Sequence, residues 1–198
     1  MKSSRNPFHL VAFLLLCTLP AIAQSPASDA KTFSKDGLSF SYPVGWSVED
    51  SSNDDLQQLT LTNPRSEAQF RLFVHRGRIS EDKLAQAKKS LIDPYLASTF
   101  KQFADIGGKP TRTDASVDIG STKAEGVIIR AMLDEPGAAE IYWALINQRV
   151  VVLTLFGPDK ALKQAAPVWD QLRNSLQIAD SKPADKPTPM PTPKPALK

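Results

Sequence analysis

The sequence is poor in the side chains that most often carry enzyme chemistry. Its 198 residues include one cysteine, Cys17, and two histidines, His9 and His75. Cys17 and His9 both lie in an N-terminal segment with the pattern of a signal peptide, so a mature chain would keep one histidine and no cysteine. This excludes a thiol nucleophile, a thiolate metal site and disulfides, and it disfavours zinc sites, which usually take several His or Cys ligands. Cys17 follows three leucines and not the small residue of a lipoprotein signal, so we do not expect lipidation.

The first residues of the chain predict export. Two basic residues precede an apolar run over 8–19, and Ala21 and Ala23 occupy the two positions that a signal peptidase reads. The run is shorter than the roughly 20 apolar residues that a membrane-spanning helix needs. We therefore predict a signal peptide over 1–23, cleavage before Gln24, and a periplasmic or extracellular protein.

An excess of charge of one sign is also lacking once the two ends are set aside. The chain has 24 Lys and Arg against 21 Asp and Glu. Two of the bases precede residue 24, and four lysines and two aspartates follow residue 179, which leaves 18 bases against 19 acids in 24–179. Nucleic-acid binding needs a concentrated basic surface, so we predict no nucleic-acid partner.

Composition divides the chain into four zones. A short Ser/Ala linker over 24–30 follows the signal peptide, one domain covers 31–179, and a tail over 180–198 holds six of the sixteen prolines. The domain is long enough to bury a core of its own. Proline fixes φ and lacks an N–H, so we predict a disordered, extended tail. A stalk or a polyproline II ligand for another protein is the alternative for the tail.

Alternating apolar and polar residues predict that strands dominate the domain. The residues 150–153 are apolar on both faces, which indicates a central strand that is covered on each side. The first expected strand is 38–42, and 46–49 is expected to return alongside it. Two further strands are expected at 57–62 and at 70–75. Two hairpins follow, one of 116–119 and 123–133 around Gly120-Ser121 and one of 140–146 and 149–156 around Asn147-Gln148.

Helical spacing of apolar residues predicts two helices. The first begins at Ser80, and we expect Pro94 to kink it or to start a second segment that Asp93 caps. The last follows Asp159, and we expect Pro167 to bend or divide it. Strands, a helix, more strands and a closing helix, with tight hairpin turns, predict an α+β domain whose mostly antiparallel β-sheet packs against helices.

The residues 35–46, Lys-Asp-Gly-Leu-Ser-Phe-Ser-Tyr-Pro-Val-Gly-Trp, resemble the first hairpin of Mog1/PsbP-like proteins, which include bacterial DcrB-like exported proteins. The order of elements is similar as well, and so is the ending, where 151–157 leads into a tryptophan-bearing helix and then into 174–178. The resemblance covers about 33–179. It implies an α/β/α sandwich, with helices on both faces of the antiparallel sheet. Family members include an assembly subunit of photosystem II and a factor that binds a small GTPase, so it also implies binding or assembly without enzymatic activity.

Basic residues gather on one predicted strand and on the turn expected after it. Arg71 and His75 share a strand face, and Arg76 and Arg78 flank Gly77 just before the first helix. Guanidinium groups pair well with carboxylate or phosphate. We therefore predict that Arg71, His75, Arg76 and Arg78 bind an anion or the acidic surface of a partner. The alternative is a solvated strand edge.

The sequence contains no set of residues that specifies a reaction. It has no Gly-x-Ser-x-Gly elbow and no glycine loop that would cradle a phosphate. A hydrolase using carboxylates among Glu125, Asp134, Glu135 and Glu140 is the enzymatic alternative.

We predict a non-enzymatic exported protein, a monomer without cofactor or metal, that binds a protein partner or helps to assemble an envelope complex. Peripheral association with the envelope or its membrane stays open. A third interpretation, by analogy with some DcrB-like proteins, is a role in envelope stress or in phage infection.

Overall fold

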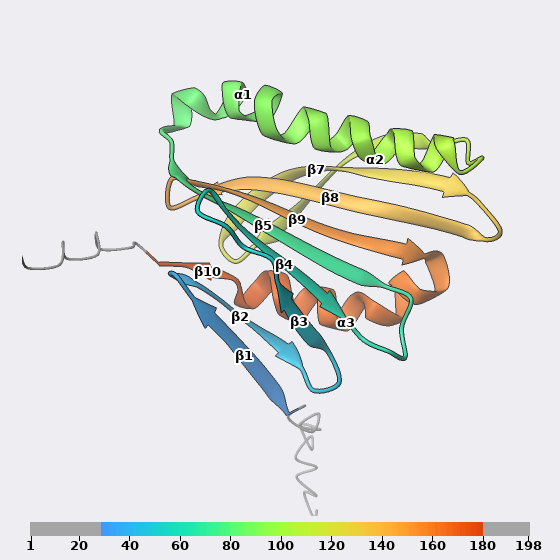
Figure 1. The fold of residues 1–198 in the computed structure, drawn as a ribbon, viewed down its shortest axis with the longest axis horizontal. Helices are drawn as coiled ribbons and strands as arrows, with labels where there is room; N and C mark the ends of the chain where they lie inside the picture. The colour runs from blue at the N-terminus through green and yellow to red at the C-terminus, as the bar shows by residue number, and fades with distance from the viewer. Residues whose placement is uncertain (1–28, 180–198) are drawn as a thin grey trace, which may run out of the picture.

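The computed structural model describes residues 29–179, which form two antiparallel sheets and two helical segments (Figure 1). The predicted signal peptide, the start of the predicted linker and the predicted tail over 180–198 lie outside the described residues. The first strand, β1 (Ala30–Lys35), begins at the last residue of the predicted linker.

A three-stranded sheet contains the first hairpin. Its strand order is β1-β2-β10, with β2 (Leu38–Pro43) in the middle and β10 (Gln177–Ile178) at one edge. Asp36 and Gly37 turn the chain between β1 and β2, both with positive φ (50° and 77°). Such two-residue turns favour Asp-Gly because their backbone is left-handed at both positions. The sequence did not reveal β1, since Phe33 is the one large apolar residue in it.

The strand after Trp46 does not return alongside β2, so the predicted pairing of 46–49 is wrong. β3 (Ser47–Asp50) pairs instead with β4 (Leu56–Thr62) in a second sheet. Pro43 has no N–H to continue a ladder, and Gly45 turns the chain with φ 94°. Trp46 then packs against Phe70 of the second sheet, with ring centroids 4.8 Å apart. The segment that looked like a hairpin is therefore a crossing between two sheets.

The second sheet has seven strands in the order β3-β4-β5-β9-β8-β7-β6, and every pairing in it is antiparallel. Its central strand is β9, which confirms the prediction for 150–153. The hairpins predicted around Gly120-Ser121 and Asn147-Gln148 are also confirmed. The remaining strands are β5 (Gln69–Arg78), β6 (Thr111–Ile119), β7 (Thr122–Met132), β8 (Pro136–Ile146) and β9 (Arg149–Pro158). β6 begins before the predicted residue 116 because its exposed first half does not alternate.

One helical segment packs on the face of the large sheet that we call the α2 face. It consists of η1 (Glu81–Lys83), α1 (Leu84–Ala87), a π-helical turn η2 (Lys88–Ile92) and α2 (Asp93–Asp105). Ser80 precedes it in an extended conformation, without a side-chain capping bond. α2 starts at Asp93 with Pro94 in its first turn, as predicted for a second segment, but Ile92 takes the N-cap position and Asp93 does not cap the helix with its side chain.

The other helix, α3 (Asp159–Ser175), continues through Pro167, so of the two predicted effects of this proline, a bend or a division, the division is wrong. Pro167 is exposed, and water can bond the carbonyl that loses its helical donor. Within residues 29–179, no helix is both long enough and apolar enough to span a membrane.

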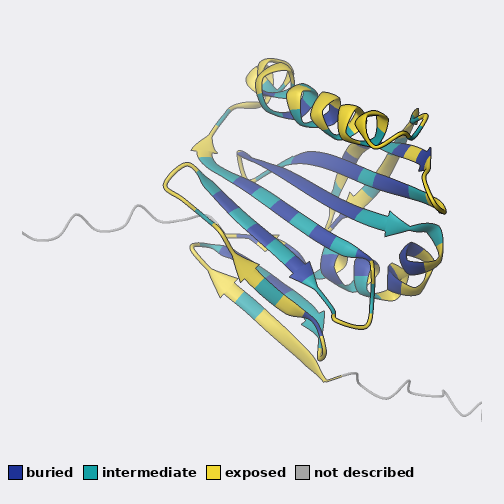
Figure 2. Cartoon of the chain, turned by 45° about the vertical axis from the view of Figure 1, so that its right-hand side comes forward, coloured by how far each residue is buried: buried dark blue, intermediate teal, exposed yellow. Residues whose placement is uncertain are grey.

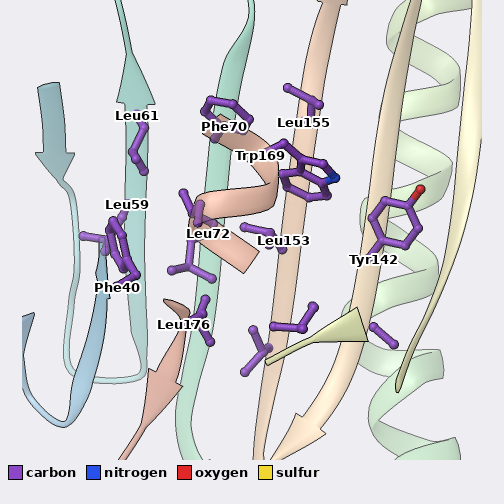
Figure 3. Packing of buried hydrophobic residues seen from close by; sticks show 14 of the residues in the cluster. Phe40, Leu59, Leu61, Phe70, Leu72, Tyr142, Leu153, Leu155, Trp169 and Leu176 are labelled. Carbon is purple, nitrogen blue, oxygen red and sulfur yellow. The ribbon is translucent and has the colours of Figure 1, made fainter. Parts of the chain in front are cut away.

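The large sheet is the middle layer of the domain. The α1–α2 segment lies over β7, β8 and β9 on one face, while α3 and the three-stranded sheet cover the other (Figure 1). Buried residues concentrate in the central strands, and exposed ones follow β1 and the outer side of the helices (Figure 2). On the α3 face, Trp169 stacks on Phe70 at 5.9 Å, next to Leu153 and Leu155 (Figure 3). The predicted α+β class, with helices on both faces of an antiparallel sheet, is confirmed.

A close approach between two strands gives the first testable prediction. Gly126 of β7 lies opposite Tyr142 of β8. A Cβ at Gly126 would lie 2.2 Å from Cδ1 of Tyr142 and 2.6 Å from the carbonyl oxygen of Ile141. We expect Gly126→Ala to lower the free energy of unfolding by about 1–3 kcal/mol, because the backbone oxygen cannot move away cheaply.

Gly77→Ala is the matched control, since a Cβ there would meet nothing within 4 Å. Urea unfolding of both variants measures the difference. Equal stabilities for the two alanine variants would contradict the packing argument.

Candidate functional site

A cleft opens on the α2 face where α2 meets β5 and β9. It has a volume of about 190 Å³, and its lining includes Arg71, Tyr95, Thr99, Phe103, Thr154 and Phe156. We call it the Arg71 cleft. The aromatic rings make its walls apolar, while the arginine and the hydroxyl groups make one part of it polar. Arg71, one of the four predicted site residues, therefore lines a cleft of the structure.

Arg71 is held in place by two contacts in the cleft. Its guanidinium carbon lies 4.6 Å from the centre of the Phe156 ring, and its Nε donates to Oε1 of Gln69 at 3.2 Å. Arg71 lies opposite Thr154 in the register of β5 and β9, so the two side chains share a face. Among residues 29–179, no carboxylate forms an ion pair with Arg71. Its charge is thus oriented but not neutralised.

Two hydroxyl groups form the polar floor of the Arg71 cleft. Oη of Tyr95 and Oγ1 of Thr154 lie 3.2 Å apart and share a hydrogen bond. The Tyr95 ring packs edge-on against Phe73 at 5.4 Å, and Thr99 donates its hydroxyl to the Tyr95 carbonyl at 2.9 Å. Thr154 is almost completely buried, with 1% of its surface exposed. The floor is therefore fixed by contacts within the protein.

His75 lies further along β5 on the same face, and Phe73 stands between it and Arg71. At about 3.3 Å per residue, the two α-carbons are roughly 13 Å apart. His75 is half-buried, and burial together with the positive charge of Arg149 lowers its pKa. The structure thus places His75 near other basic residues, but outside the Arg71 cleft.

Arg76 connects β5 to two other parts of the chain. Its Nη2 pairs with Oδ2 of Asp36 at 2.9 Å, and its Nε donates to the carbonyl oxygen of Asn53 at 2.8 Å. The prediction that 76–78 form a turn is wrong, because these residues extend β5 beyond an irregularity in its pairing with β9. Much of the Arg76 donor capacity is used inside the protein.

A second basic cluster consists of His75, Arg76, Arg78 and Arg149. Arg149 was not singled out from the sequence. It is 3% exposed, and its Nε donates to the carbonyl oxygen of His75 at 2.8 Å. Its Nη2 donates to Oε1 of Gln57. Burial, followed by the charges of Arg76 and Arg78, lowers the pKa of Arg149. The structure brings His75, Arg76 and Arg78 together around Arg149 and places Arg71 apart. Only the pairing of β9 with β5, which the sequence does not reveal, could have shown this.

Of the carboxylates in the hydrolase alternative, Glu125 and Glu140 lie on opposite faces of the sheet, whereas Asp134 and Glu135 line one hollow together. Glu125 lies opposite Trp143, which packs on the α2 face. Glu140 accepts a hydrogen bond from the hydroxyl of Tyr142 at 3.2 Å, and Tyr142 packs on the α3 face. Burial and the neighbouring carboxylate raise the pKa of Tyr142, so its hydroxyl stays protonated as the donor. Within 29–179 no group of three or more His, Asp or Glu is placed to hold a metal ion.

A wider hollow on the other side of α2 is a weaker candidate. It measures about 600 Å³ and is lined by Lys88, Lys101 and Arg112. Lys88 pairs with Asp93 at 3.0 Å, and Lys101 bonds Asp105 one helical turn away. Carboxylates of the same helical segment engage both lysines, and Arg112 lies 3.9 Å from Oδ1 of Asp114, so each cation of this hollow has an acidic neighbour, which Arg71 lacks among the described residues.

No family model matches the chain, and no curated protein matches it. Among solved structures, the PsbP of the cyanobacterium Synechocystis sp. PCC 6803 is similar with a TM-score of 0.49 and 12% identity, over 81% of this chain and 99% of that one. A protein from Bacteroides thetaiotaomicron is similar with a TM-score of 0.52 and 14% identity, over 76% of this chain and 49% of that one. This chain thus spans about half the length of the Bacteroides protein, and their similarity concerns the fold alone.

The lowered pKa of His75 gives a prediction about pH. The unfolded chain takes up a proton on His75 near the usual pKa of 6.5, whereas the folded protein does so only at lower pH. The unfolded state therefore gains stability as the pH falls below about 6.5, and the free energy of unfolding decreases. We expect His75→Gln to remove this part of the pH dependence in urea unfolding between about pH 8 and 5. An unchanged slope in the variant would show that His75 is not the responsible group.

Proposed function

We propose that this protein is an exported binding protein of the cell envelope, without catalytic activity, and that it binds a protein partner through the Arg71 cleft. The observation that carries the proposal is the state of the Arg71 guanidinium. Gln69 and Phe156 hold it beside apolar walls, and no carboxylate of the described residues neutralises it. A positive charge in such surroundings is stabilised by an anionic group that a partner brings.

The chemistry of the cleft supports binding over catalysis. Its lining within the described residues includes no carboxyl group and no histidine. General acid–base catalysis needs a group that changes protonation near the working pH, and arginine remains charged throughout that range. The hydroxyls of Tyr95 and Thr154 bond to each other, and the described lining residues include no carboxylate or histidine that could act as a base for either one.

The proposed export and the proposed protein partner are supported by features of the sequence. The predicted signal peptide over 1–23 supports export. The resemblance of 35–46 to Mog1/PsbP-like proteins supports a binding or assembly role. A role in envelope stress or phage infection remains an analogy, since no contact or cleft favours it.

Affinity capture from the native envelope tests the proposal. Wild-type protein and the variant Arg71→Gln serve as baits, and we expect the variant to lose most of the partner that the wild type recovers. Arg112→Gln is the matched control, because Arg112 is an exposed arginine on the same face, beyond α2, and its nearest carboxylate oxygen is 3.9 Å away. Equal recovery by Arg71→Gln, or no specific capture by the wild type, would refute the proposal.

A further bait, Arg76→Gln, tests the other part of the basic site that the sequence predicted. Arg76 already bonds Asp36 and the Asn53 carbonyl. We expect this variant to lose stability by about 1 kcal/mol or less, as is usual for a partly exposed ion pair, and to capture the partner as the wild type does. Loss of capture by a folded Arg76→Gln bait would move the binding surface to the basic end of β5.

A further inference from the structure

We infer that the Arg71 cleft recognises a carboxylate group at the end of a short apolar group. A free fatty acid and the C-terminus of a protein with an apolar last residue both carry this chemistry. The inference rests on the proposed function, because it assigns a ligand class to the same cleft.

The orientation of Arg71 leaves one edge of its guanidinium group for a ligand. The Nε atom donates to Gln69, and the flat face of the group lies over the Phe156 ring. The two terminal nitrogens have no hydrogen-bond partner among the described residues. That edge matches the two oxygens of a carboxylate, which accept two parallel hydrogen bonds. The hydroxyl pair of Tyr95 and Thr154 lies on the same face and adds neutral polar contacts.

Charge balance favours an anion with a single charge. Arg71 is the one charged residue among the described lining residues. A carboxylate would be neutralised by it, whereas a doubly charged phosphate would keep an unpaired charge next to the rings of Phe103 and Phe156. Burying unpaired charge beside apolar surface is costly.

The residues next to the cleft determine which end of the ligand lies at Arg71. A second hollow of about 270 Å³ shares Phe103 and Phe156 with the Arg71 cleft and continues to Leu133. Asp134 and Glu135 also line this second hollow and are absent from the lining of the Arg71 cleft. These acidic residues repel a carboxylate, so the charged end belongs at Arg71. The apolar part then runs along Phe103 and Phe156 towards Leu133.

The size of the cleft limits the ligand. Its volume of about 190 Å³ is smaller than the roughly 300–1,000 Å³ of pockets that enclose drug-sized molecules. Ile106, one of its lining residues, is 65% exposed, so the cleft is accessible to solvent on that side. The cleft therefore suits a short acyl chain or one apolar side chain at a chain end, with the remainder of the ligand outside.

A two-dimensional NMR titration of the mature chain from Gln24 tests the inference with two pairs of probes. One pair is octanoate and its neutral analogue octanamide. The other is an acetylated tetrapeptide ending in leucine, with a free carboxyl group or with a C-terminal amide. We expect at least one acid to shift resonances of residues around the cleft, and its amide to bind at least about tenfold more weakly.

Variants link this binding to the residues named above. Arg71→Gln should weaken binding of the acid by about tenfold or more and leave binding of the amide unchanged. Arg112→Gln should change neither. Gln102→Trp, at an exposed position of α2 that lines the cleft, should block both acid and amide without disturbing the core.

The inference is overturned if neither acid binds the wild type, if the amides bind as well as the acids, or if Arg71→Gln binds the acid unchanged. Binding of octanoate alone identifies a fatty acid, and binding of the peptide acid alone identifies a protein C-terminus. Failure of both acids, with envelope capture still dependent on Arg71, overturns this inference and leaves the proposed function standing. Acid binding without Arg71-dependent capture supports the inference and refutes the protein partner.

Discussion

The central strand β9 is apolar on both faces, and the rest of the domain is arranged to cover it. Val151, Leu153 and Leu155 face α3, whereas Val150 and Val152 face the α1–α2 segment. A strand of this kind must lie in the middle of a sheet with a layer on each side. Thr154 is a buried polar residue within this strand, on the α2 face, and the cleft opens above it. The cleft thus lies over the one polar residue of the central strand that faces α2, where the α1–α2 segment does not fill the α2 face completely.

The sequence predicted correctly the elements that are determined by residues close together in the chain. Tight turns and alternation were enough for the hairpins of β6–β7 and β8–β9, and the proline in the first turn was enough for the start of α2. The partner of each strand depends on long-range packing. The crossing at Trp46 looked like a hairpin, because Pro43 and Gly45 end a strand equally well at a turn and at a passage between sheets. Nothing local in 38–49 distinguishes the two.

The candidate site shows the same limit. Arginine and histidine on one strand were a fair reason to suspect Arg71, but its neighbours come from elements far along the chain. Thr154 faces it through the β5–β9 register, and Tyr95 reaches the floor from α2. Arg149 was invisible for the same reason, since its contact with His75 depends on which strand lies next to β5. A site assembled across strands requires the strand order, which alternation alone does not provide.

The two basic regions of β5 differ in how their charge is used, and this difference is the reason for proposing the binding site at Arg71 and not at Arg76. At one end, Asp36 and backbone carbonyls take up the donors of Arg76, and Gln57 and the His75 carbonyl take up those of Arg149. These arginines hold the two sheets and neighbouring strands together. Arg71 stands apart from the other basic residues in the sequence, and no carboxylate within residues 29–179 pairs with it. The cluster of basic residues at the end of β5 therefore has a structural role, and the proposal of a ligand site rests on the Arg71 charge beside apolar rings.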